Sequence, residues 1–150
     1  MTQSAIALLV AALAIVSGIA ALSLRTLSMP GNAPDRLVAE LRLAQVAALV
    51  LALTAGASLG LVASHGDRAG LTLEVAAAMG VFVVATAAPF RDPRVALTWL
   101  ALGFGAHAVL DVLHRPGLLP DSLAPAWYIV GCSLKDVLLG ALCYLPLLRR

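Results

Sequence analysis

Five apolar runs of about 20 residues dominate the chain, and the segments between them carry most of its charged residues. A helix of about 20 apolar residues is long enough to cross the hydrocarbon core of a bilayer. The chain is 61% hydrophobic and 12% charged, whereas soluble domains are about 45–50% apolar and about 25% charged. The sequence therefore predicts one all-α domain, a polytopic bundle of five transmembrane helices spanning residues 4–24, 43–64, 71–90, 94–114 and 126–147.

The arginines between the runs predict how the bundle is oriented. With five spans, Arg68 and Arg115 lie on one side, and seven others lie on the opposite side: Arg25, Arg36, Arg42, Arg91, Arg94, Arg149 and Arg150. Cytoplasmic segments carry the excess of Lys and Arg. This asymmetry predicts an N-out, C-in topology. The Ala, Leu and Arg bias favours a bacterial source and hence a multi-pass protein of the bacterial cytoplasmic (inner) membrane.

Residues at the helix starts refine the boundaries. Pro34 suits a first helical turn, so the second helix should begin before the membrane with a water-exposed turn or two that contains Asp35, Arg36, Glu40 and Arg42. Asp92 followed by Pro93 has the pattern of a cap and first turn for the fourth helix.

Charge and cysteine usage exclude some partners and linkages. A net charge of +2 without a basic run argues against nucleic acid as a partner and leaves the lipid bilayer as the predicted environment. Cys132 and Cys143 share one helix and lie about 16 Å apart along it. That separation is too large for a disulfide within the chain.

The fourth run contains His107, Asp111 and His114, the polar residues on which the functional interpretation depends. Their spacing of i, i+4 and i+7 places them within about 60° of one another on one helical face. Ionisable side chains in a membrane helix are by default candidates for a functional site.

Further polar residues converge on the same region if neighbouring helices are antiparallel. Helix five descends from the outer surface and carries Cys132 and Asp136 on one stripe, and helix three carries Glu74 about one turn from the same surface. We therefore expect a site in the outer half of the bundle, with Asp136 near mid-membrane. Lys135 is adjacent to Asp136 but about 100° round the helix, which makes it an awkward partner within that helix and leaves a partner on a different helix as the alternative.

Three functions and one structural role fit these residues. A divalent transition metal could be held by His107, Asp111 and His114, although two helical turns separate the histidines. A proton-coupled transporter would use the same His and Asp groups as a relay, and an enzyme would use His107, Asp111 and Asp136 for acid–base catalysis on a membrane-soluble substrate. Alternatively, they hydrogen-bond between the helices of a non-catalytic scaffold or assembly subunit.

Other cofactors and motifs are less compatible with the sequence. Two histidines on one helical face cannot sandwich a single haem, so bis-His haem is not expected. Nothing in the chain reads as a P-loop, a dinucleotide-binding fingerprint or a nucleophile elbow. The segment 56–60, Gly-Ala-Ser-Leu-Gly, is a GxxxG pattern. It favours close helix packing inside the bundle, with a homo-oligomer interface as the alternative.

The last two helices also resemble a known group of proteins. The pattern runs His107-x3-Asp111-x2-His114 and then Pro125-x-Trp127-Tyr128-x3-Cys132-x3-Asp136. It resembles that of small, uncharacterised bacterial multi-pass membrane proteins to which no activity or cofactor is attached. The resemblance covers about a quarter of the chain and implies that the two helices form one site. The chain departs from the group's double-histidine form because Arg115 follows His114, which makes a metal site less secure.

Overall fold

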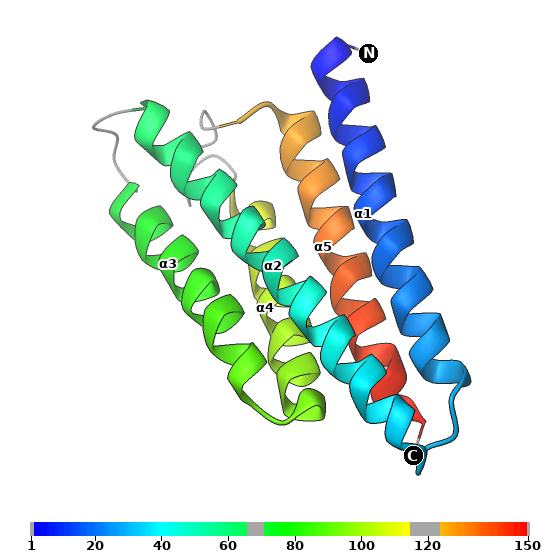
Figure 1. Cartoon of the computed structure of the whole chain (residues 1–150). Coiled ribbons are helices and arrows are strands. Elements are labelled where there is room, and N and C mark those ends of the chain that lie inside the picture. Colours follow the sequence, from blue (N-terminus) through cyan, green and yellow to red (C-terminus); the bar gives the residue numbers. More distant parts are fainter. Residues whose placement is uncertain (1, 66–70, 115–123, 150) are drawn as a thin grey trace.

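The computed structural model describes residues 2–65, 71–114 and 124–149. These ranges form five long helices: α1 (Gln3–Ser28), α2 (Pro34–His65), α3 (Leu71–Ala87), α4 (Pro93–Leu113) and α5 (Ala126–Tyr144) (Figure 1). Short 3-10 segments, η1 (Ala88–Phe90) and η2 (Leu145–Leu148), follow α3 and α5. All five helices are long and apolar enough to cross a membrane, so the predicted all-α membrane bundle is confirmed. Arg68 and Arg115 lie outside the described residues.

The helices form a row with one helix laid across it. Neighbours along the row are α3, α4, α5 and α1 (Figure 1). Helix α2 passes in front of α4 and α5 and contacts all four helices of the row. Helix α2 has 32 residues, about 48 Å at 1.5 Å per residue, whereas the hydrocarbon core is about 30 Å thick. Because α2 is longer than the membrane core, it can run obliquely and still extend beyond it.

The predicted helix starts agree with the structure. Helix α2 begins at Pro34, and α4 begins at Pro93 with the Asp92 carboxylate accepting a hydrogen bond from the Arg94 backbone N–H at 3.0 Å. This cap fixes where α4 starts and therefore how deep each of its polar residues lies.

A buried arginine at the start of α2 connects the end of α1 to η2. The Arg36 guanidinium donates to the carbonyls of Met29, Pro146 and Arg149 at 2.8–3.0 Å, and it forms an ion pair with Glu40 at 3.0 Å. Arg36 and Glu40 are 2% and 3% exposed. The expectation that both lie in a water-exposed turn is therefore wrong, because the ends of α1 and η2 cover them.

Close helix approach occurs at glycines other than the predicted ones. A side chain on Gly140 of α5 would meet the Ala101 carbonyl oxygen of α4 at 3.1 Å. Gly56 and Gly60 are exposed, and nothing lies within 4 Å of where their Cβ atoms would be. The interpretation of the GxxxG segment as packing inside the bundle is therefore wrong, and an interface with another chain stays a prediction.

The Arg36 network should dominate the stability of this end of the bundle. In Arg36→Met three carbonyls lose a donor and Glu40 loses its closest cation, so we expect the free energy of unfolding to fall by about 3 kcal/mol or more. Arg42→Met, at an exposed arginine on the same helix, should change it by no more than about 0.5 kcal/mol. Denaturant titration in detergent micelles measures both, and equal losses would contradict the network's role.

The Gly140 contact predicts a second stability difference. Gly140→Val forces a branched side chain against the α4 backbone and should lower the free energy of unfolding by about 1–3 kcal/mol. Gly105→Val, at a membrane glycine with open space around its Cβ position, should not destabilise the fold, because valine is the better helix former. The same titration compares the two variants; a Gly140→Val protein as stable as the parent would show that α5 can move away from α4 without cost.

Candidate functional site

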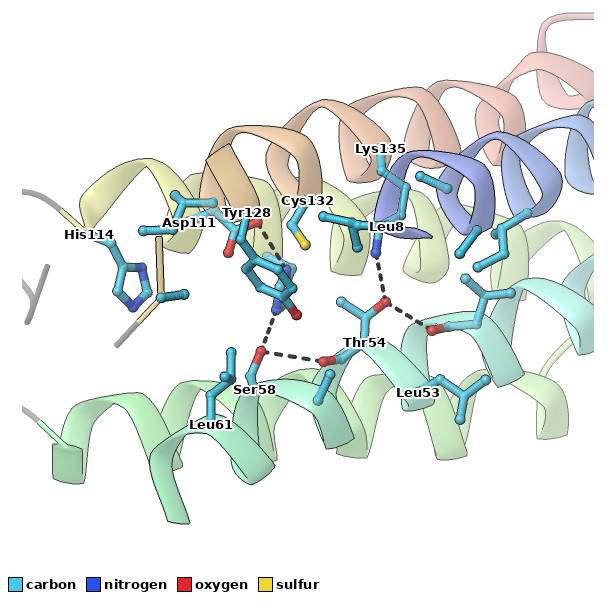
Figure 2. Close-up of a pocket in the computed structure, with 18 of the residues that line it drawn as sticks. Leu8, Leu53, Thr54, Ser58, Leu61, Asp111, His114, Tyr128, Cys132 and Lys135 are labelled. Carbon is cyan, nitrogen blue, oxygen red and sulfur yellow. Dashed lines mark hydrogen bonds and ion pairs between the residues drawn. The ribbon is translucent and has the colours of Figure 1, made fainter. Parts of the chain in front are cut away.

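The candidate site lies in a cavity of about 210 Å³ toward the end of the bundle where α1 begins. Its walls come from α1, α2 and α5 and are mostly apolar, and the polar face of α4 lines it from behind. The polar side chains that line it are Thr54, Ser58, Glu74, His107, Asp111, His114, Tyr128, Cys132 and Lys135, most of which are labelled in Figure 2.

The central contact of the site joins α4 to α5. His107 Nδ1 lies 2.8 Å from Asp136 Oδ2, and Asp136 is fully buried. A carboxylate can only accept, so the imidazole Nδ1–H donates to it, and in the neutral imidazole His107 Nε2 keeps its lone pair. Gly140 lies one turn below Asp136 and lets α5 approach α4 closely enough for this bond.

The second ring nitrogen of His107 faces α2. Ser58 Oγ lies 3.1 Å from His107 Nε2, and the Ser58 hydroxyl also lies 3.3 Å from the Thr54 carbonyl of its own helix. Because Nε2 is unprotonated in this tautomer, it accepts the hydrogen bond from the Ser58 hydroxyl. The imidazole thus connects a buried carboxylate on one side to a cavity-lining hydroxyl on the other (Figure 2).

Lys135 holds the other oxygen of Asp136. Its ammonium lies 3.0 Å from Asp136 Oδ1, an ion pair by distance that falls outside hydrogen-bond geometry, and it donates to Thr54 Oγ1 on α2 at 3.1 Å. The expectation that Lys135 is an awkward partner for its neighbour is therefore wrong, because the flexible lysine stem curls back to the carboxylate. A single cation ties Asp136 to α2.

Asp111 completes a compact group of acidic and imidazole ligand atoms. His107, Asp111 and Asp136 each offer one ligand atom, and these atoms lie within 4.8 Å of one another. Asp111 Oδ2 is buried without a hydrogen-bond partner and lies 3.7 Å from His107 Nδ1. With a neutral imidazole, the two carboxylates and Lys135 sum to one negative charge. A proton or a cation would neutralise that charge.

His114 belongs to a different contact. Its Nε2 lies 2.8 Å from Glu74 Oε1 on α3, and its Nδ1 lies 2.9 Å from the Leu110 carbonyl one turn earlier. The Glu74 contact is an ion pair by distance, but its angle falls outside hydrogen-bond geometry. His114 and Glu74 line the same cavity as His107 and Asp111. Within the described residues, however, the ligand atom that lies close to those of His107 and Asp111 comes from Asp136, whereas the prediction had placed His114 there.

Sequence reasoning located most of this region but missed one side of it. The residues expected to converge in the outer half lie together around the cavity: Glu74, His107, Asp111, His114, Cys132 and Asp136. Ser58 and Thr54 were not anticipated as site features, and neither was the ion pair between Lys135 and Asp136. Ser58 and Thr54 lie one turn apart in a helix of apolar residues, and that spacing is the signal that could have marked them.

The lysine–aspartate contact should be strongly coupled energetically. Lys135→Met strips Asp136 of a cation, and Asp136→Asn leaves Lys135 as a charge without a counter-ion, so each should destabilise the fold by about 3 kcal/mol. The double variant should lose less than the sum, with a coupling energy of about 1–3 kcal/mol.

A matched cycle provides the control for that coupling. Lys135→Met combined with Glu74→Gln should be additive within about 0.5 kcal/mol, because Glu74 pairs with His114 instead. Denaturant titration of the two sets of variants measures both coupling energies. Additivity in the Lys135–Asp136 cycle would show that the contact contributes nothing to the bundle.

Comparison of the chain with protein-family models, curated proteins and solved structures found no match. The chain is an integral membrane protein with a buried His–Asp group, and its chemistry has to be inferred from the contacts described above.

Proposed function

We propose that this chain is a membrane enzyme that performs acid–base chemistry on a membrane-soluble substrate, with His107 as the proton-transferring residue. The observation that carries the proposal is the orientation of the imidazole. Asp136 holds Nδ1, and the unprotonated Nε2 points to a cavity-lining hydroxyl. A buried carboxylate behind a histidine fixes its tautomer and stabilises the imidazolium formed when Nε2 takes a proton. Asp136 is thus a positioning residue.

The apolar walls of the cavity support a lipid-like substrate. Helix α1 contributes Leu8, Ala12 and Ile15 to the cavity, and none of its described residues before Ile19 is buried. A second groove of about 270 Å³ runs between α1 and α5 and shares Leu8, Ala12, Cys132 and Lys135 with the cavity. A substrate dissolved in the bilayer can therefore reach the imidazole from the side, along loosely packed α1.

The arginine distribution supports an outward-facing site in a bacterial inner membrane. The described arginines lie at the end of the bundle away from the cavity, and several take part in the Arg36 network. By the positive-inside rule that end faces the cytoplasm. The proposal therefore places His107 in the outer half of the membrane, with the N-terminus outside.

A transmembrane proton relay fits the contacts less well. About 20 Å of α4 separates His107 from Arg94 and Glu40, the nearest polar cluster toward the other end. Within the described residues that interval is filled by buried apolar side chains: Leu43, Ala47, Leu51, Leu97, Leu100, Phe104, Leu139 and Cys143. A layer of this kind offers no hydrogen-bonded path for protons. This favours a site that is closed toward the Arg94–Glu40 end of the bundle over a relay that crosses the membrane.

A metal enzyme is the second candidate, and one observation favours it. The ligand atoms of His107, Asp111 and Asp136 lie within 4.8 Å of one another, and Asp111 Oδ2 is buried without a hydrogen-bond partner. Nitrogen and carboxylate oxygen ligands suit a divalent transition metal. However, Lys135 lies 3.0 Å from Asp136 Oδ1, and a cation already in place repels a second one. The metal-free site is therefore the better supported.

The acid–base proposal predicts lipid conversion that depends on His107. Purified protein in nanodiscs of bacterial polar lipids should convert at least one lipid species, followed by mass spectrometry. His107→Gln and Asp136→Asn should slow conversion by about 10²–10⁴-fold, the usual contribution of general acid–base catalysis. Arg42→Met, at the opposite end of the bundle, is the control. Absence of conversion by the parent protein, or full conversion by His107→Gln, would refute the proposal.

Metal analysis of the same preparations separates the two candidates. Elemental analysis of the parent, His107→Gln and Asp111→Asn should show no stoichiometric metal in any of them, because the Lys135 ammonium beside Asp136 repels a second cation. About one metal per chain in the parent, lost in both variants, would instead establish the metal site.

A further inference from the structure

We propose that Ser58 is a nucleophile, and that the site cleaves or transfers the acyl group of a lipid carboxylic ester. This inference deepens the proposed function and rests on it, because the serine needs His107 as its base. Ser58, His107 and Asp136 come from three different helices, α2, α4 and α5. Their contacts reproduce the order hydroxyl, imidazole, carboxylate that activates a serine for acyl transfer.

Distances along this chain of contacts fit that role. Ser58 Oγ lies 3.1 Å from His107 Nε2, and His107 Nδ1 lies 2.8 Å from Asp136 Oδ2. Both are within the 2.6–3.2 Å reach expected between a nucleophile, its base and the group that orients the base. The bond from Ser58 to the Thr54 carbonyl is longer, at 3.3 Å, so the hydroxyl proton is better directed at the imidazole.

The sequence around Ser58 contains a weaker hint of the same chemistry. The expectation that nothing in the chain reads as a nucleophile elbow is incomplete, because residues 56–60 do spell the letters of that motif, G-x-S-x-G. That motif places its serine on a sharp turn between a strand and a helix, whereas Ser58 lies inside the continuous helix α2. The letters alone therefore do not identify a nucleophile here, and the contacts with His107 carry the inference.

Each proton and bond in the reaction has a place. Ser58 Oγ attacks the ester carbonyl carbon as its proton moves to His107 Nε2, which forms a tetrahedral intermediate. When the intermediate collapses, the carbon–oxygen bond to the alcohol breaks, and His107 returns the proton to the leaving alkoxide. Water, or a second alcohol, then gives its proton to His107 and attacks the acyl-serine. The products are the free acid or a new ester, and Ser58 regains its proton.

A donor for the developing oxyanion is available on α5. Tyr128 lines the same cavity, and in Figure 2 its hydroxyl end points toward α2, where Ser58 and Thr54 lie. A hydroxyl directed at the intermediate stabilises the negative charge that forms on the carbonyl oxygen. Tyr128 is therefore the residue to which we assign this stabilisation.

The charge of the site favours a neutral ester over a phosphate ester. Among the described lining residues Lys135 is the only lysine or arginine, and Asp136 already neutralises it. Asp111 supplies no positive charge, and its ionised form would repel an anionic phosphoryl group. An uncharged acyl ester with its chain along the apolar wall of α1 avoids that repulsion.

Covalent labelling tests the nucleophile directly. The probe is a long-chain alkyl fluorophosphonate, from which an activated serine displaces fluoride to form a stable adduct. Intact mass and peptide mapping of the parent protein in nanodiscs should place one adduct on Ser58. Labelling should be absent in Ser58→Ala and fall at least about 10²-fold in His107→Gln. Ser133→Ala, at a membrane serine bonded to the Ala108 carbonyl, should label like the parent.

Turnover distinguishes failure of this inference from failure of the proposed function. With p-nitrophenyl palmitate as substrate, Ser58→Ala should lose at least about 10³-fold in kcat/KM. If Ser58→Ala converts lipids as fast as the parent while His107→Gln does not, Ser58 is not the nucleophile and the acid–base site stands. An adduct on any residue other than Ser58 overturns the inference as well. If the parent is neither labelled nor active on any lipid, both proposals fail.

Discussion

The fully buried carboxylate of Asp136 is the constraint on which the arrangement of helices around the cavity depends. An anion in the middle of a membrane costs several kcal/mol unless it is paired or hydrogen-bonded. One oxygen of Asp136 accepts a hydrogen bond from His107 on α4, and the other forms an ion pair with Lys135, which also reaches Thr54 on α2. Satisfying one charge therefore positions three helices relative to one another, and the same contacts set the orientation of the imidazole.

The two ends of the bundle differ in how tightly α1 is packed. At the end that contains the chain's C-terminal residues, Arg36 joins α1, α2 and η2 through buried hydrogen bonds. At the opposite end α1 has no buried residue in its first sixteen positions, and grooves lie on both of its sides. Buried polar contacts therefore hold the helices together at one end, whereas apolar grooves beside α1 remain open at the other.

Most of what could be predicted about the site came from the few polar side chains that interrupt the apolar helices. His107, Asp111 and Asp136 stand out because each is costly in a membrane, and antiparallel neighbours bring them to one depth. Ser58 does not stand out in this way, because a neutral hydroxyl in a helix, with the carbonyl one turn earlier within bonding distance, carries little cost in lipid. The pairing of Lys135 with Asp136 was not predicted because angles around a helix describe where Cα atoms lie. The four-carbon side chain of Lys135 is long enough to bring its ammonium to the Asp136 carboxylate.

Hydrophobic run length and proline caps are local properties of the chain. The sequence by itself therefore determined that there are five membrane-length helices, that two of them start at Pro34 and Pro93, and where the ionisable groups gather. Which glycines allow close contact was decided only by tertiary structure, since Gly140 meets α4 while Gly56 and Gly60 face away from the bundle. Tertiary structure also decided the partners of each polar group. Helix rotation and crossing angle place Ser58 on one side of His107 and Asp136 on the other, and neither quantity is encoded in any single helix.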